Sequence, residues 1–461
     1  MATRKNGLPD VSFETIDGNL KSGNGLSTQE QTSCLLFDIS TQKDLFKKGY
    51  GLTNADKINE GEVIALLNES DMEEYGIIPY TEPKEGQTVD DTNFMYGIPH
   101  YHISEYYRGR RQAAVKEDGT GSGELYIMFA DCSKNWDAIE ILQNSTGGSA
   151  FQIGIYTEQS LFNAEGDEDG NYAVRLVSSL QDKALVLQES HAPAVILLQA
   201  NPSKIDGAEV GSELKVDINK IPSLLTDKRS AVSVFLGQAN HSEVNRMQLA
   251  NPTSCPVGII GLALGVTSNA KVSESIAWVG RFNLFGEKFQ RIEFGFGDLT
   301  KVDDKFVSTN RYESFNNITL GKLSDKGFNF LMKYAGAPSG IYFTYDSTIS
   351  TGDFSSISSN RTIFKSERLV RGALLPFLHS PVTLSLTDGS LSATSISDFS
   401  NAINDALQTM VVNNEISGKK VFIDPKQKVL QDDTLRVEYG LIPRGKTSHI
   451  IVKQSYETNS K

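Results

Sequence analysis

Continuous apolar runs alternate with segments of helical period through the first two thirds of the chain. The runs predict buried strands over residues 32–39, 124–130, 151–156, 194–199 and 231–237. Spacing of three to four residues predicts helices over residues 100–111, 136–142, 176–187 and 218–226, and a helix or strand–helix unit over 62–75. Uninterrupted strands that alternate with helices are typical of a mainly parallel sheet covered on both faces.

A largely apolar stretch over residues 256–279 predicts one buried helix, in which Gly258, Gly261 and Gly265 would permit close approach of another backbone. After residue 298 the pattern changes to shorter elements. These are short strands over 322–344, a helix over 362–378 and strands over 381–386, 420–424, 434–442 and 448–456. The cleanest amphipathic helix spans residues 397–412, with Ser397 as its predicted N-cap.

The predicted fold class is therefore a multidomain combination of α/β and α+β. At about 150 residues per domain, 461 residues predict roughly three domains. The predicted divisions are an arm over 1–25, an α/β region of one or two subdomains over 26–320, an α+β domain over 321–446 and a strand arm over 447–461.

Each end of the chain carries a strand-like segment with no hairpin partner beside it. The stretches 21–25 and 444–446 have the composition of hinges, which would let each strand leave its domain. Unpaired strands are a liability unless another chain completes them, so the pattern indicates a self-assembling structural component. The predicted arm residues are Val11, Ser12, Phe13, Glu14, Thr15, His449, Ile450, Ile451, Val452, Lys453 and Tyr456.

Composition narrows the class of protein. The hydrophobic fraction of 39% is ordinary for a folded chain, and the charge is 44 − 57 = −13. Such an acidic balance disfavours binding to nucleic acid or to anionic membranes. Cys34, Cys132 and Cys255 lie far apart and are expected to be small buried hydrophobes in a reducing compartment. With no signal peptide and no membrane-spanning run, the chain is expected to be soluble and cytoplasmic when made.

No set of residues assembles into a recognisable active site. The glycine-rich stretch 119–123 precedes a strand instead of following one, so it predicts a turn and not a phosphate loop. The acidic loop 165–170 resembles a calcium loop, but Leu176 stands where the bidentate glutamate belongs. His100 and His102 diverge on a helix and have no third ligand in sight. We therefore expect no enzyme activity, metal or cofactor.

An ordered series of motifs over residues 323–461 resembles the contractile tail-sheath family of phages and related injection systems. The series includes 323–331 (LSDKGFNFL), 340–344 (GIYFT), 359–361 (SNR) before a long helix, 423–425 (IDP) and 437–443. Upstream, 8–14 (LPDVSFE), 101–108 (YHISEYYR) and 277–282 (AWVGRF) are similar to a divergent branch of that family.

The resemblance implies a bacteriophage virion tail, or a contractile injection particle, assembled in the bacterial cytoplasm. The subunit would be a homo-oligomer in stacked hexameric rings around an inner tail tube, with the inner tube, baseplate and tail-terminator proteins as partners. Contraction of this helical assembly would drive the tube through a cell envelope. The arms would pair with strands of other subunits. The helix 397–412 would pack on the C-terminal sheet and turn Asp398, Asn401 and Asp405 toward the tube.

Three alternatives stay open at this point. Residues 323–461 also fit a generic α+β domain, the whole chain fits another tail component such as a baseplate or terminator protein, and an α/β core also suits a hydrolase or a nucleotide-binding protein.

Overall fold

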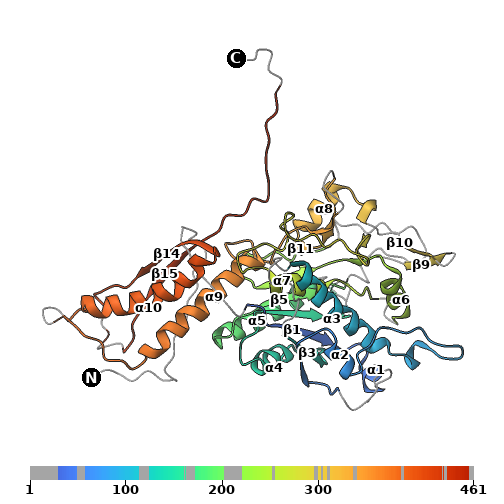
Figure 1. Ribbon diagram of the computed structural model, residues 1–461, viewed down its shortest axis with the longest axis horizontal. Coiled ribbons are helices and arrows are strands. Elements are labelled where there is room, and N and C mark those ends of the chain that lie inside the picture. Colours follow the sequence, from blue (N-terminus) through green and yellow to red (C-terminus); the bar gives the residue numbers. More distant parts are fainter. Residues whose placement is uncertain are drawn as a thin grey trace.

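The molecule has a body, a smaller lobe beside it and a C-terminal segment whose later residues stand away from both (Figure 1). In this computed structural model the described residues are 30–48, 58–113, 124–159, 161, 172–201, 221–251, 255–294, 299–302, 305–308, 312–335, 340–385, 389–427, 429 and 433–455. We call described residues 30–356 the body, 375–443 the lobe and 444–455 the C-terminal segment. Helix α9 (Ile357–Leu374) joins the body to the lobe.

A seven-stranded sheet forms the centre of the body, in the order β11-β6-β5-β4-β1-β3-β2. Its strands are β1 (Ser33–Asp38), β2 (Val63–Leu66), β3 (Leu125–Ala130), β4 (Gln152–Tyr156), β5 (Val195–Gln199), β6 (Val232–Phe235) and β11 (Phe328–Asn329). Only β2 runs antiparallel to its neighbour β3. These parallel pairings confirm the mainly parallel sheet predicted from the apolar runs. Strands β1, β4 and β5 are buried along their whole length, as expected of a sheet covered on both faces.

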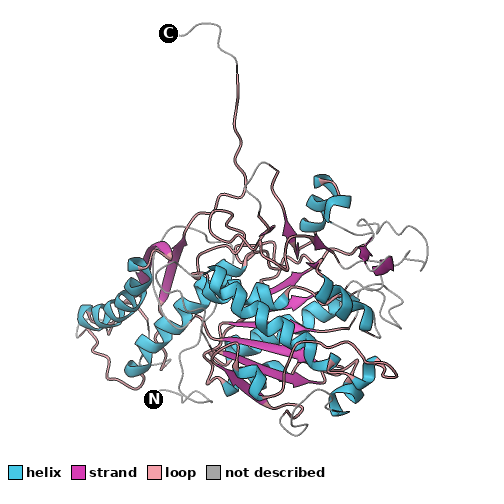
Figure 2. Cartoon of the chain, turned by 45° about the vertical axis from the view of Figure 1, so that its right-hand side comes forward, coloured by secondary structure: helices cyan, strands magenta, loops and turns pink. Residues whose placement is uncertain are grey.

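Helices cover both faces of this sheet (Figure 2). The crossover from β1 to β3 and the crossover from β3 to β4 run in opposite directions along the sheet, so right-handed connections place their helices on opposite faces. Helix α3 (Phe94–Ala113) with α7 (Ile260–Asn269) forms one layer, and α4 (Ala138–Ser145) with α5 (Tyr172–Glu189) forms the other. The shorter helices of the body are α1 (Lys43–Lys48), α2 (Asp71–Glu74), α6 (Ser242–Ala250) and α8 (Asn317–Ser324), with 3-10 turns η2 (Val89–Asp91) and η3 (Tyr312–Ser314).

Helices α3 and α7 touch backbone to backbone. A Cβ atom at Gly261 would lie 2.1 Å from the carbonyl oxygen of His102, and one at Gly265 would lie 2.1 Å from that of Tyr106. The close approach expected at these two glycines is confirmed. The predicted helix over 256–279 is wrong in length, because Gly258 has φ +83° and Ala270 is extended, so the helix spans only ten residues.

Tertiary pairing overrides local preference in two further places. Residues 221–226 lie where a helix was predicted, yet the amide of Thr226 donates to the carbonyl oxygen of Ile349 in an extended arrangement. Residues 381–385 form no strand and make one bridge between Leu384 and Leu391. Three short antiparallel pairs complete the described body: β7 (Gln238–Ala239) with β8 (Ile292–Glu293), β9 (Leu299–Val302) with β10 (Lys305–Ser308), and β12 (Leu331–Met332) with β13 (Tyr342–Phe343).

The lobe pairs one long helix with a two-stranded sheet. Helix α10 (Ala393–Val412) packs on β14 (Ile416–Phe422), which is antiparallel to β15 (Glu438–Pro443), and the turn η4 (Leu375–Phe377) follows α9. The predicted N-cap Ser397 is wrong: the cap is Ser392, whose hydroxyl accepts from the amide of Ser395. The domain divisions stay a prediction, and β11, which follows residue 320, pairs with β6 in the body.

Candidate functional site

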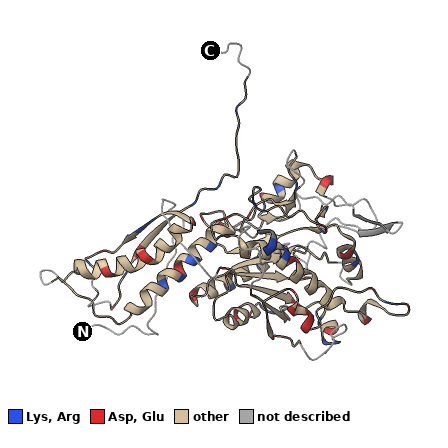
Figure 3. Cartoon of the chain, viewed as in Figure 1, with Lys and Arg blue, Asp and Glu red and all other residues tan. Residues whose placement is uncertain are grey.

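Helix α10 has one buried and one exposed face. The buried face carries Ser395, Phe399, Ile403, Leu407 and Met410 at spacings of three and four residues. Asp398, Asn401 and Asp405 all lie on the exposed face. No Lys or Arg occurs along the helix, so its solvent side is polar and acidic, as the red segments in Figure 3 show. That this face meets an inner tube stays a prediction.

The C-terminal segment is extended and exposed over its whole described length. The side chains of Ile450, Ile451 and Val452 are 80%, 89% and 80% exposed, which is unusual for three consecutive large apolar residues. Within the described residues no strand of this chain pairs with them. His449 approaches the body, with its Nε2 atom 3.2 Å from the Tyr345 hydroxyl, and Lys453 is exposed. The remaining predicted arm residues, Tyr456 and Val11 to Thr15, lie outside the described residues.

Lys446 fixes the beginning of this segment to the body. Its ammonium group donates to Oδ2 of Asp346 at 3.0 Å, to Oγ of Ser356 at 2.9 Å and to Oγ of Ser358. Ser356 is the N-cap of α9, so the contact lies at the start of the joining helix. Burial alone would raise the pKa of Asp346, but the charge of Lys446 and hydrogen bonds from Ser358, Lys446 and Ser275 outweigh burial and lower that pKa.

Arg444 fixes the same stretch to the lobe. Its guanidinium donates from Nη1 to the carbonyl oxygen of Asn414 at 2.8 Å, in the turn between α10 and β14. Residues 444–446 therefore cross from the lobe to the body with a polar contact at each end. The hinge predicted here from composition is held at both of its ends in this structure.

Helix α9 joins the body and the lobe through buried charges. Lys365 lies 2.6 Å from a carboxylate oxygen of Glu30 and 2.8 Å from one of Glu415, and its side chain is only 2% exposed. Arg361, one turn earlier, donates to the carbonyl oxygens of Ala270 and Glu30. Burial lowers the pKa of Arg361 to about 10 and raises that of Glu415. Two cations and two carboxylates thus share one site with no net charge.

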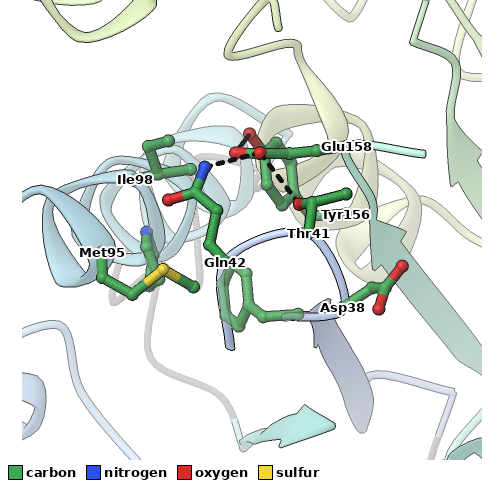
Figure 4. Close-up of a pocket in the computed structure, with 9 residues that line it drawn as sticks. Asp38, Thr41, Gln42, Met95, Ile98, Tyr156 and Glu158 are labelled. Carbon is green, nitrogen blue, oxygen red and sulfur yellow. Dashed lines mark hydrogen bonds between the residues drawn. The ribbon is translucent and has the colours of Figure 1, made fainter. Parts of the chain in front are cut away.

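The sheet also has a crevice in the position where doubly wound proteins bind ligands. Strands β3 and β4 lie on opposite sides of β1. The connections that leave the carboxyl ends of β1 and β4 therefore run in opposite directions along the sheet. The hollow there, lined by Asp38, Gln42 and Glu158 among others (Figure 4), has room for no more than about one water molecule.

The acidic side chains of this crevice are hydrogen-bonded to other groups of the protein. Asp38 accepts from the hydroxyl of Thr157 at 2.7 Å and from the amide of Cys132 at 3.1 Å. Glu158 accepts from the side-chain amides of Gln42 at 2.5 Å and Asn251 at 2.8 Å. Neither residue was predicted from the sequence, although an acidic residue at the end of one buried strand and another two residues past the end of its neighbour were a usable signal.

The other candidate chemistry does not come together in the described residues. His100 and His102 both lie on α3, where burial lowers their pKa values to about 4 and about 3. The amide of Gly261 donates to Nδ1 of His102 at 3.4 Å, which makes that imidazole part of the contact between α3 and α7. Residues 119–123 and 165–170 lie outside the described residues. Among the described residues, no three His, Cys, Asp or Glu side chains are grouped to hold a metal ion.

The three cysteines are buried and free, as expected of small hydrophobic residues. Burial raises the pKa of Cys34, Cys132 and Cys255, which keeps them as unreactive thiols. No helix in the described part of the chain has the length and apolar character needed to cross a membrane.

Comparison with known proteins identifies the fold. Residues 353–461 match the family described as DUF2586, C-terminal domain, which covers α9, the lobe and the C-terminal segment. No curated protein sequence matches the chain. A chain in the structure of the anti-feeding prophage baseplate is similar at a TM-score of 0.53 and 12% identity, covering 98% of this chain and 100% of its own.

A second solved structure is similar over the same extent. A chain of the sheath complex of PVC, an extracellular contractile injection system in its contracted state, gives a TM-score of 0.52 at 11% identity and covers 99% of both chains. The chain shares its fold with components of contractile injection particles. At 12% and 11% identity the likeness is one of fold.

Proposed function

We propose that this chain is the structural subunit of a contractile tail sheath, polymerising as stacked hexameric rings around an inner tube. The observation that carries the proposal is the C-terminal segment, whose Ile450, Ile451 and Val452 are 80–89% exposed and unpaired within the described chain. Exposure of large apolar side chains to water is unfavourable, and a second copy of the chain could remove them from water by pairing with this segment. The full-length likeness to a chain of a contracted sheath complex supports the same role.

Strand addition is the proposed means of linking subunits. Within the described residues the sheet of the lobe consists of β14 and β15, so each has an outer edge of backbone donors and acceptors not satisfied by the other. The C-terminal segment of one copy would add to such an edge in a neighbour, and residues 11–15 would do so at another. Main-chain hydrogen bonds formed this way persist while the subunits rotate, and many weak pairings sum to a strong lattice.

Contraction requires one fold with two arrangements of its neighbours. The buried charges on α9 support movement of the body and lobe together, because separating them would expose Lys365 and Glu415 without partners. The exposed face of α10 would meet the inner tube in the extended state. The ends of the cylinder would contact baseplate and terminator proteins, in a virion tail or an injection particle assembled in the bacterial cytoplasm.

Electron microscopy of the purified full-length chain tests this proposal. Hollow, transversely striated cylinders are expected, since sheath subunits polymerise into them. Uniform discrete particles would contradict the proposal. Co-expression with a tail-tube protein from the same particle should give filled cylinders.

A baseplate component is the second candidate, favoured by the likeness to a chain of the anti-feeding prophage baseplate. It predicts closed rings that do not stack. An α/β enzyme is the weaker alternative, because Asp38 and Glu158 at the crevice are engaged by Thr157, Gln42 and Asn251. It predicts turnover of a substrate, with residues of this crevice required.

A further inference from the structure

The first residues of the C-terminal segment cross the junction between lobe and body. The chain leaves the lobe at Pro443, contacts the lobe again through Arg444 and reaches the body at Lys446. His449 then approaches Tyr345, the neighbour of Asp346. Beyond His449 the segment stands free of the described body, as the dark red trace in Figure 1 shows. In this arrangement the segment can pivot only after residue 449.

The contact at Asp346 is built so that Lys446 can leave it. Without Lys446, the carboxylate of Asp346 still accepts from the hydroxyl of Ser275 at 2.9 Å and from the hydroxyl and amide of Ser358. It also lies at the N-terminus of α9, where the helix dipole favours negative charge. Asp346 would therefore remain hydrogen-bonded and electrostatically favoured after release.

Lys446 is equally suited to release. Its side chain is 30% exposed, while that of Asp346 is 8% exposed. An ammonium group at the edge of the protein regains water readily when it leaves its partners, and such partly exposed pairs contribute little net stability. A segment drawn away by a neighbouring subunit would then break a few hydrogen bonds, and the carboxylate left behind at Asp346 would keep its hydrogen bonds from Ser275 and Ser358.

We propose that Lys446 is a releasable latch that sets the pivot of the C-terminal segment. With Lys446 on Asp346 the pivot lies after His449; with Lys446 and His449 both released it moves back to Arg444, which stays on Asn414. Release frees residues 445–449, which extend the reach of the segment by about 17 Å at about 3.3 Å per residue. The reach of the C-terminal segment is therefore short when Lys446 is bound to Asp346 and long when it is released. This is a property of each subunit, and it goes beyond the proposed role in assembly.

Distances between spin labels in the full-length chain test the latch. The native cysteines are buried, so labels react at Ile318→Cys on the body, Val412→Cys on the lobe and Ile451→Cys on the segment, positions that are 75%, 72% and 89% exposed. Labelled chains are diluted with unlabelled full-length chains, so that each measured distance lies within one subunit whether or not cylinders form. Failure of the latch is thereby separated from failure of the assembly proposal.

The unaltered chain should give one narrow distribution for the label pair 318 and 451, within the freedom of two residues past the pivot. In Lys446→Gln the distance distribution of the pair 318 and 451 should broaden and extend to longer distances. The distribution of the pair 318 and 412 should stay unchanged. Asp346→Asn should act in the same direction as Lys446→Gln, and it serves as the second variant should either one fold poorly. Lys453→Gln, a matched change in the same segment past the pivot, should alter nothing.

Two outcomes would overturn the latch. One is a distribution for 318 and 451 that stays as narrow in Lys446→Gln and Asp346→Asn as in the unaltered chain. The other is an equally broadened distance distribution for the pair 318 and 412, which would show that Lys446 holds the whole lobe against the body.

Discussion

Lys365 and Glu415 form an ion pair 2.8 Å long at the joint between body and lobe, with side chains that are 2% and 4% exposed. Lys365 belongs to α9, and Glu415 directly precedes β14, so the pair ties the joining helix to the sheet of the lobe. Buried ion pairs add little net stability over apolar residues of the same shape, but they fix one arrangement in place of many. The pair is therefore best understood as setting the orientation of the lobe.

Replacing Lys365 alone should lower the free energy of unfolding more than replacing Lys365 together with both of its carboxylate partners. Lys365→Met leaves Glu415 and Glu30 as buried carboxylates without their lysine, and should lower the free energy of unfolding by about 3 kcal/mol. The variant Lys365→Met with Glu30→Gln and Glu415→Gln should recover most of that loss. Urea unfolding followed by circular dichroism measures both. Equal losses in the two variants would show that the carboxylates left without Lys365 carry no penalty.

The contact between α3 and α7 should tolerate no side chain at Gly265. In Gly265→Ala, a methyl group would lie 2.1 Å from the carbonyl oxygen of Tyr106, so the helices must separate, at a cost of about 2 to 3 kcal/mol. Gly372→Ala is the matched control, because that glycine is in α9 with nothing within 4 Å. It should stabilise the protein by about 0.5 to 1 kcal/mol. Thermal unfolding of both variants distinguishes helix propensity from packing, and a stabilising Gly265→Ala would contradict the structure.

Stability should fall as the pH drops below about 6.5. In the fold, burial lowers the pKa of His102 to about 3, whereas an unfolded histidine titrates near 6.5. The unfolded chain therefore binds a proton that the folded chain does not, and stability is complete above pH 6.5 and decreases toward the folded pKa. Between pH 7 and pH 5 the loss from His102 alone is about 2 kcal/mol.

His100, with a pKa of about 4, acts in the same direction, while Glu415, whose pKa is raised, partly offsets it. Urea unfolding at several pH values measures the sum. His102→Asn, which keeps an acceptor near the amide of Gly261, should have a shallower slope between pH 7 and pH 5. A slope identical to that of the unaltered chain would show that the pKa of His102 is the same in the folded and the unfolded chain.

Charge on the exposed face of α10 should govern binding to the tube under the proposed function. Asp398→Lys reverses one of two charges on that face without touching the buried residues, and should weaken co-sedimentation with tubes by about tenfold. Asp182→Lys on the exposed face of α5 is the control and should have no effect. Cylinders should form in both variants. Unchanged tube binding in Asp398→Lys would remove α10 from the tube interface.

The sequence predicted the central sheet well because its signal is local. The strand pattern around Cys34, Ile127 and Ile196 is uninterrupted and apolar, and burial on both faces requires such runs. The helix predicted at residues 218–226 failed for a nonlocal reason: Thr226 pairs with residues more than 120 positions later. The start of α10 was misplaced because Ser392 and Ser397 are equally good caps, and the hydrogen bonds of Ser395 with Thr383 determine the choice.

The candidate surfaces were only partly accessible to sequence reasoning. Alternation at Ile450 and Val452 indicates a strand, and the exposed face of α10 follows from its period. The partners of Lys446 could not be predicted, because Asp346, Ser356 and Ser358 meet it only after the lobe has folded back toward the body. The charges around Lys365 come from three distant segments for the same reason.

The most direct test of the central claim is electron microscopy of the full-length chain beside a variant that lacks residues 448–461, each checked by circular dichroism. The deleted residues make no strand pair within the described chain, so the variant should keep the spectrum and solubility of the full-length protein. The account predicts hollow striated cylinders from the full-length chain and none from the variant. Normal cylinders from the variant, or uniform discrete particles from the full-length chain, would contradict it.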